Sequence, residues 1–161
     1  MEKAETILVA YATKRGSTRE VAADVARVIR QSGVEVEIVP AREVKSLDRY
    51  QAVVIGGALY MGRWHKDARK LLKRYRSQLV SLPLAVFAMG PKTSEPEALA
   101  GAGAELARAL HDAPEVHPFA TTVFGGVFSF GKKHAVDARD WKAIENWANE
   151  VVRGLSGRSG T

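Results

Sequence analysis

A loop of small, hydroxylated and basic residues follows the first apolar run of the sequence. It consists of Thr13, Lys14, Arg15, Gly16, Ser17 and Thr18. A helical pattern begins where it ends, and free backbone amides at a helix N-terminus, aided by the helix dipole, favour an anion. Small residues also let the backbone approach that anion closely. The loop therefore predicts a phosphate site, and the alternative is an ordinary capped turn.

The spacing within this loop excludes two common phosphate-binding motifs. It matches neither G-x-x-x-x-G-K-[ST] nor G-x-G-x-x-G, which excludes a P-loop nucleoside triphosphatase and a dinucleotide-binding site. A receiver domain would need acidic residues at the end of the first strand to hold a metal ion, and Tyr11, Ala12 and Thr13 provide none. A phosphomonoester on an organic cofactor remains.

The loop resembles the FMN-phosphate loop of flavodoxins, which has the form T/S-x-T/S-G-x-T/S directly after the first strand. Thr13, Gly16 and Thr18 match this form, whereas Arg15 stands where the family usually has a hydroxyl residue. The resemblance implies a non-covalently bound FMN whose phosphate lies against residues 13–18.

A second motif follows the third apolar run and reads VIGGALYMGRWH over residues 54–65. It resembles the flavin-ring loop of flavodoxin-like proteins, most closely in the branch that contains menaquinone-dependent protoporphyrinogen oxidase. The resemblance implies that the flavin ring is flanked by Ala58, Leu59, Tyr60, Met61 and Gly62, with Tyr60 and Met61 as an apolar wall. Glycines at Gly57 and Gly62 would let a peptide turn beside the ring.

The aromatic and imidazole groups of this motif also have structural interpretations. For Tyr60, Met61 and Trp64 the alternative is plain packing in the core or on the surface. For His65, a lone histidine before a basic helix, a solvated or structural role is favoured over a functional one.

Two further segments follow the fourth and fifth apolar runs. By the resemblance, the second flavin-ring loop consists of Met89, Gly90, Pro91 and Lys92. It has no aromatic residue, so one face of the flavin would be more open, and Lys92 either balances charge on the reduced ring or is solvated. Residues 124–134 combine glycines with Phe128 and Phe130, which would cover that open face, contact a planar acceptor or pack against the last helix.

Basic residues gather on the predicted helix after the ring motif. They are Lys66, Arg69, Lys70, Lys73, Arg74 and Arg76, with Arg63 just before them. This face would attract an acidic redox partner, an anionic substrate or membrane headgroups. The alternative, a merely solvated face, is somewhat favoured because Leu71, Leu72, Tyr75 and Leu79 already explain the helix.

The composition of the 161 residues limits the chemistry further. The chain has no cysteine, which excludes disulfides, thiolate nucleophiles and cysteine-bound iron–sulfur clusters. Redox chemistry would therefore need a bound organic cofactor. The formal charge of +6 selects no partner by itself. The charged Met1–Glu5 segment and the absence of a long apolar window lead us to expect a cytoplasmic protein without a membrane span.

The elements that carry these loops alternate between strands and helices. Short, almost continuously apolar runs predict five buried strands, at Thr6–Tyr11, Val34–Val39, Ala52–Ile55, Leu82–Ala88 and Thr121–Phe124. Helical periodicity predicts helices between them, a last helix from about Asp137, and a loose tail over residues 154–161. We therefore expect one flavodoxin-like domain over residues 1–153, a three-layer α/β sandwich with a five-stranded parallel sheet of order 2-1-3-4-5.

The function that the resemblance implies is FMN-dependent electron transfer to a protein or small organic acceptor. No side chain is expected to act as a catalytic acid or base, because the flavin carries the chemistry. The alternative is an oxidoreductase acting on a quinone or porphyrinogen. The short segment after the fifth strand favours a carrier, whereas the basic charge and the ring motif favour the oxidase branch. A flavin-free module that binds acidic protein or nucleic acid through the basic helix is less favoured.

Overall fold

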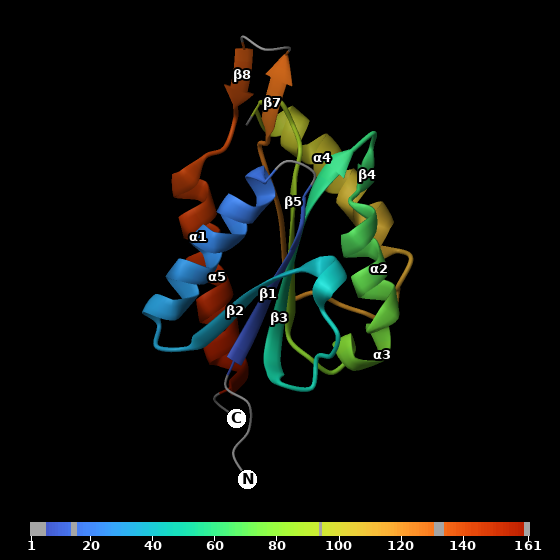
Figure 1. The fold of residues 1–161 in the computed structure, drawn as a ribbon, viewed down its shortest axis with the longest axis vertical. Coiled ribbons are helices and arrows are strands. Elements are labelled where there is room, and N and C mark those ends of the chain that lie inside the picture. The colour runs from blue at the N-terminus through green and yellow to red at the C-terminus, as the bar shows by residue number, and fades with distance from the viewer. Residues whose placement is uncertain (1–5, 14–15, 94, 131–133, 160–161) are drawn as a thin grey trace.

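The chain folds into a three-layer α/β sandwich (Figure 1). The computed structural model describes residues 6–13, 16–93, 95–130 and 134–159. Five parallel strands form the central sheet in the order β2-β1-β3-β5-β6. Their bounds are β1 Thr6–Ala12, β2 Glu35–Pro40, β3 Tyr50–Tyr60, β5 Leu84–Met89 and β6 Ala120–Phe124. Counted along the chain, this is the predicted 2-1-3-4-5 order, which is therefore confirmed.

The third strand is much longer than the apolar run that predicted it. It continues past Ile55 through Gly56 and Gly57, which pair with β1 and β5 on either side. A Cβ on Gly56 would lie 2.0 Å from the Phe87 ring, so only glycine fits at this position of β3. Beyond the sheet, β3 turns into the two-residue strand β4 (Arg63–Trp64), which pairs with it antiparallel.

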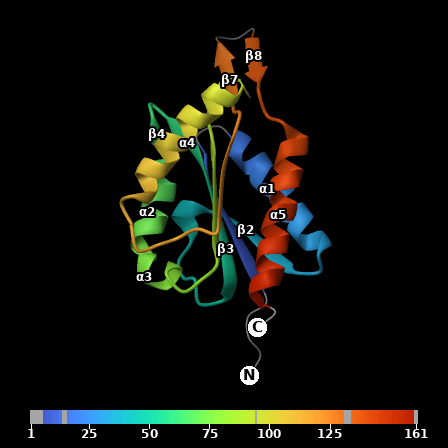
Figure 2. The same ribbon diagram turned by 180° about the vertical axis from the view of Figure 1, so that it is seen from behind.

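Helices cover both faces of the sheet (Figures 1 and 2). One face carries α1 (Ser17–Gln31) and α5 (Trp141–Ser159). The other carries the 3₁₀ turn η1 (Ala41–Glu43), α2 (Lys66–Arg74), α3 (Arg76–Leu79) and α4 (Pro96–Leu110). Successive residues of β1 point to opposite faces of the sheet. Ile7 and Val9 pack with α1 and α5, whereas Leu8 and Ala10 pack with α2 and α4.

The first helix begins and ends close to where its sequence predicts. Val21, Val25 and Ile29 are buried along its inner face. Gly33 stops it with a positive φ of 96°, and the Gly33 amide donates to the Arg30 carbonyl at 2.9 Å. The single helix expected after the ring motif is instead divided at Tyr75 into α2 and α3.

The last helix starts later and runs further than expected. Asp137 ends a strand, and Asp140 caps the helix by accepting from the Ala143 amide at 3.1 Å. The helix then continues to Ser159, so the expectation of a loose tail over residues 154–161 is wrong as far as Ser159. Packing explains the extension, because Leu155 contacts the core beneath α1 and α5.

An antiparallel hairpin follows β6, where the sequence predicted only a loop. It consists of β7 (Val127–Phe130) and β8 (His134–Asp137), and it projects past the carboxyl ends of the parallel strands (Figure 1). The side chains of Phe128 and Phe130 lie outside the described part of the structure, so their role stays a prediction.

Candidate functional site

The three loops expected to hold the flavin follow neighbouring strands at the same edge of the sheet. Ala12 at the end of β1 is opposite Gly57, and Ala58 is opposite Met89 at the end of β5. Because these strands are parallel, β1, β3 and β5 all end at the same edge of the sheet, where the predicted site loops follow them (Figure 1). Of the predicted site residues, Lys14 and Arg15 lie outside the described part of the chain.

The first loop has the backbone geometry of an anion site. Gly16 stands at the N-cap of α1 with a φ of 93°, and no side chain caps the helix. The first turn therefore keeps the orphan amides that such a cap would satisfy. The Thr13 hydroxyl accepts from the Gly16 amide at 3.0 Å, which closes the loop on itself. An anion placed here would meet the amides of Ser17 and Thr18 and the positive end of the helix dipole.

Thr18 adds an unusual polar group to this loop. Its residue is fully buried, and its Oγ1 has no hydrogen-bond partner in the described structure. Leaving a buried hydroxyl unpaired costs about 1–3 kcal/mol, so such groups are uncommon without a ligand or water to bind. The residues present therefore fit a phosphate group in both their backbone and their side-chain donors.

The second loop is a tight β3–β4 hairpin with an apolar tip. Tyr60 pairs with Arg63, and the two residues between them both have positive φ, 53° at Met61 and 77° at Gly62. This is the backbone of a type I′ turn, which favours glycine at its second position. Tyr60 is 58% exposed and Met61 is 84% exposed. The hairpin thus presents an apolar surface at the site instead of burying it.

Trp64 has the core-packing role that was its alternative, and His65 has the structural role that was favoured for it. Trp64 is 1% exposed, and its indole N–H donates to the Gly57 carbonyl at 3.1 Å. This bond and the pairing of Gly57 with β1 and β5 hold the Gly57 peptide in the sheet. A peptide that rotates beside the ring therefore stays a prediction for Gly62, at the tip of the hairpin. His65 precedes α2, where its Nδ1 accepts from the Asp67 amide at 3.0 Å.

The third loop is tied to the strand beside it. The Gly90 amide donates to the Phe124 carbonyl at 3.1 Å, and the Gly126 amide donates to the Pro91 carbonyl at 2.9 Å. A Cβ on Gly125 would lie 2.3 Å from the Ala138 carbonyl oxygen. These glycines are therefore close-contact positions that join the third loop to the base of the β7–β8 hairpin. Lys92, at the end of this loop, is exposed.

Arg139 connects the base of the β7–β8 hairpin to the start of α1, and no sequence motif predicted this role. Its Nε and Nη2 donate to the Asp137 carboxylate at 2.9 and 2.8 Å, and its Nη1 donates to Glu20 at 3.0 Å and to the Ser17 carbonyl at 3.4 Å. The guanidinium carbon lies 4.8 Å from the centroid of the Trp141 ring. The side chain is 10% exposed, so a charged group is held almost buried by partners from three segments.

This arrangement shifts the protonation of both partners. The hydrogen bonds and charge of Arg139 hold the pKa of Asp137 below its ordinary value, and Asp137 is the main cause that raises the pKa of Arg139. The pair is therefore ionised throughout the physiological range. The contact to Glu20 joins residues 119 apart in the chain, which explains why periodicity alone did not reveal it.

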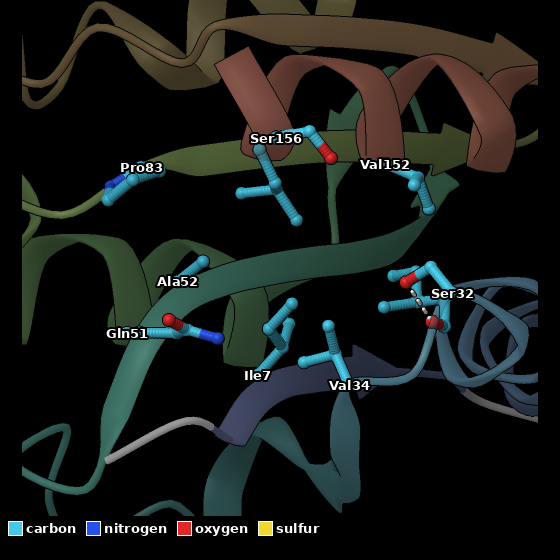
Figure 3. A pocket seen from close by; sticks show the side chains of 10 residues that line it. Ile7, Ser32, Val34, Gln51, Ala52, Pro83, Val152 and Ser156 are labelled. Carbon is cyan, nitrogen blue, oxygen red and sulfur yellow. Dashed lines mark hydrogen bonds between the residues drawn. The ribbon is translucent and has the colours of Figure 1, made fainter. Parts of the chain in front are cut away.

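A separate pocket lies at the opposite edge of the sheet, where the strands begin (Figure 3). It has a volume of about 230 Å³ and is lined by residues that include Ile7, Ile29, Ala52, Val152 and Leu155. No charged residue lines it, so it does not compete as a phosphate site. Among the described residues, no group of three or more His, Cys, Asp or Glu could hold a metal ion. No helix described in the structure is long and apolar enough to cross a membrane.

A family model for the flavodoxin domain matches residues 8–145. The chain belongs to the flavodoxin family.

Protoporphyrinogen IX dehydrogenase (quinone) from Escherichia coli strain K12 is 20% identical to this flavodoxin-family chain. The alignment covers 90% of this chain and 93% of that protein. A flavodoxin from Pseudomonas aeruginosa superposes with a TM-score of 0.65 at 17% identity, over 94% of this chain and 99% of that one. Rubredoxin oxygen:oxidoreductase from Desulfovibrio gigas superposes with a TM-score of 0.67 at 13% identity. That match covers 99% of this chain and 38% of the other protein. The structural similarities establish the fold.

Proposed function

We propose that this flavodoxin-family protein binds FMN at the edge formed by its three loops and uses it to transfer electrons. The observation that carries the proposal is the uncapped N-terminus of α1, where Thr18 keeps a buried hydroxyl without a partner. The exposed apolar tip at Tyr60 and Met61 supports it from the neighbouring strand. One loop suits a phosphate and the other suits a planar apolar ring, as FMN requires.

Each loop has a distinct role in this proposal. Residues 13–18 hold the phosphate through backbone amides and the Thr18 hydroxyl. Tyr60 and Met61 shield one side of the ring from water, and Met89–Lys92 approach its polar edge. Bound FMN supplies the redox chemistry by accepting and returning electrons. The protein contributes binding, orientation and the charge around the ring, and no side chain of the described site is needed as an acid or base.

A second candidate function is oxidation of a porphyrinogen or reduction of a quinone. The E. coli relative named for that activity aligns over nearly the full length of both chains, which favours it. An electron carrier differs in needing a protein partner for fast turnover. The expected cytoplasmic location stays a prediction in either case.

An anaerobic titration separates these functions. The FMN-loaded protein is reduced stepwise and mixed with menadione, or kept oxidised and mixed with protoporphyrinogen, while the flavin absorbance is followed. We expect stoichiometric FMN binding and slow electron transfer with both small molecules. Rapid flavin reoxidation by menadione, or rapid flavin reduction by protoporphyrinogen, would replace the carrier with an oxidoreductase, and absence of FMN binding would reject both.

A further inference from the structure

The excess positive charge of this protein is concentrated in the segment from β4 to the start of α3, which begins next to the proposed flavin site. Residues 63–76 contain seven Lys and Arg and one Asp, a net charge of +6, which equals the formal charge of the whole chain. All other segments together are therefore neutral. We define the basic face as Arg63, Lys66, Arg69, Lys70, Lys73, Arg74 and Arg76.

Few acidic groups neutralise this face. Among the described residues, the one ion pair made by the basic face joins Arg76 to Glu115 at 3.9 Å. Both of these side chains are about half exposed. Arg69 donates to the Trp64 carbonyl at 2.8 Å, a contact that leaves its charge in place. Lys66, Lys70 and Lys73 are exposed and take part in no ion pair within the described structure. A surface pair at such a distance contributes little. Glu105 and Asp112 line a hollow together with Arg63 and Arg69, so the part of the face without nearby acidic partners is formed by the exposed lysines of α2.

The fold places this face beside the exposed hairpin tip. β4 leads from Tyr60 and Met61 directly into α2, and Figure 1 shows the hairpin standing at the end of that helix. The inner side of α2 is already used, since Ala68, Leu71 and Leu72 are buried against the sheet. The surface therefore has a small apolar centre bordered on one side by positive charge, which is the anatomy of a transient protein interface.

From this placement we propose that the basic face and the Tyr60–Met61 tip form the docking surface for an acidic electron-transfer protein. The inference rests on the proposed function, because a partner docked here lies against the edge of the flavin. Because the face is positive, the partner's contact surface should be negatively charged. Because the face lies beside the proposed flavin site, the partner should be a protein that exchanges electrons. A membrane is a poorer occupant, because a membrane-binding helix leaves its apolar side free and α2 does not.

Stopped-flow electron transfer tests this surface with a defined probe, an acidic [2Fe–2S] ferredoxin. One electron passes from the reduced cluster to the FMN of the loaded protein, and no other reactant is consumed. The variant Lys70→Gln/Lys73→Gln removes two charges from the basic face. Its matched control, Lys142→Gln/Arg153→Gln, removes two exposed charges from α5 on the opposite side of the sheet.

At low ionic strength we expect the basic-face variant to lower the bimolecular rate constant about tenfold and to flatten its dependence on salt. The control variant should change the rate by less than about twofold. Photoreduction by uncharged 5-deazariboflavin should be equal in all three proteins. Equal losses in both variants, or none in either, would overturn the docking surface while leaving FMN binding intact.

Binding without electron transfer keeps the two proposals separate. If the wild-type chain binds no FMN, the proposed function fails, and the same three proteins are compared for retention on immobilised ferredoxin. Loss confined to the basic-face variant would still support the surface. Selective loss of binding to phosphatidylserine vesicles or to duplex RNA, with ferredoxin retention unchanged, would overturn it in favour of those partners.

Discussion

At the scale of single residues, the site depends on groups whose partners come from distant parts of the chain. Arg139 is the clearest example, since it fixes Asp137 at the base of the hairpin against Ser17 and Glu20 at the start of α1. A cation held this way positions the first turn that would bind phosphate. It acts through these neighbours and is therefore a positioning residue.

Replacing Arg139 should disturb ligand binding more than its distance from the ring suggests. We expect Arg139→Gln to weaken FMN binding about tenfold, and to leave Asp137 and Glu20 without their shared partner. Arg139→Lys keeps the charge and should recover part of the affinity. Arg27→Gln is the control, because Arg27 also joins α1 to α5, by a 2.8 Å contact to Glu145 far from the loop. Equal effects of both glutamine variants, by fluorescence titration, would argue against a positioning role.

The ion pair between Asp137 and Arg139 should make the stability of the fold depend on pH. The pKa of Asp137 in the folded protein lies below the ordinary 3.8, so the pair stabilises the fold above that value and the contribution disappears as pH falls through the folded pKa. Urea unfolding should show wild type more stable than Asp137→Asn at pH 7, with the difference shrinking below about pH 4. A difference that grew toward low pH would contradict this assignment.

At the scale of elements, glycines decide how closely the loops approach each other. Gly125 touches the Ala138 backbone, and Gly126 lies against Gly90, so the third loop and the hairpin base are packed together. We expect Gly125→Ala to lower the free energy of unfolding by about 1–3 kcal/mol, because backbone has no flexible end that can move away.

Gly101→Ala is the matched control for this prediction. Gly101 lies within α4, and a Cβ there would meet no atom within 4 Å. Alanine should stabilise that helix by about 0.5–1 kcal/mol. Equal destabilisation by the two substitutions, measured by chemical unfolding, would mean that the close contact at Gly125 is not what matters.

Sequence reasoning recovers the elements whose signal is local. Buried strands and the α1 helix follow from apolar runs and from Gly33 as a stop. The β7–β8 hairpin does not follow from the sequence, because a short alternation of polar and apolar residues is ambiguous. The end of α5 does not follow either, because a glycine-rich helix end forms only where packing supports it. At the site, the phosphate and ring loops were predicted from motifs, whereas Trp64 belongs to the core and Arg139 was missed. Their roles depend on contacts that no local pattern encodes.

At the scale of the whole molecule, ligand binding should stabilise the fold by mass action. The three loops come from strands spread over much of the chain, so a ligand that contacts all of them favours only the folded state. FMN at about 100 times its Kd adds about 2.7 kcal/mol. For a protein of this size that corresponds to an increase in Tm of about 5–10 °C. An unchanged Tm at saturating FMN would show that the ligand does not select the folded chain.

The most direct test of the central claim compares FMN with riboflavin, which lacks the phosphate. Both are titrated by calorimetry into ligand-free wild type and Thr18→Val, a variant of similar shape that removes the unpaired hydroxyl. We predict that wild type binds FMN far more tightly than riboflavin. The variant should lose about tenfold in FMN affinity, keep its riboflavin affinity and retain or increase its Tm, while Thr18→Asp should bind FMN still more weakly. Equal affinities of wild type for FMN and riboflavin would contradict a phosphate site at the start of α1, and with it the proposed function.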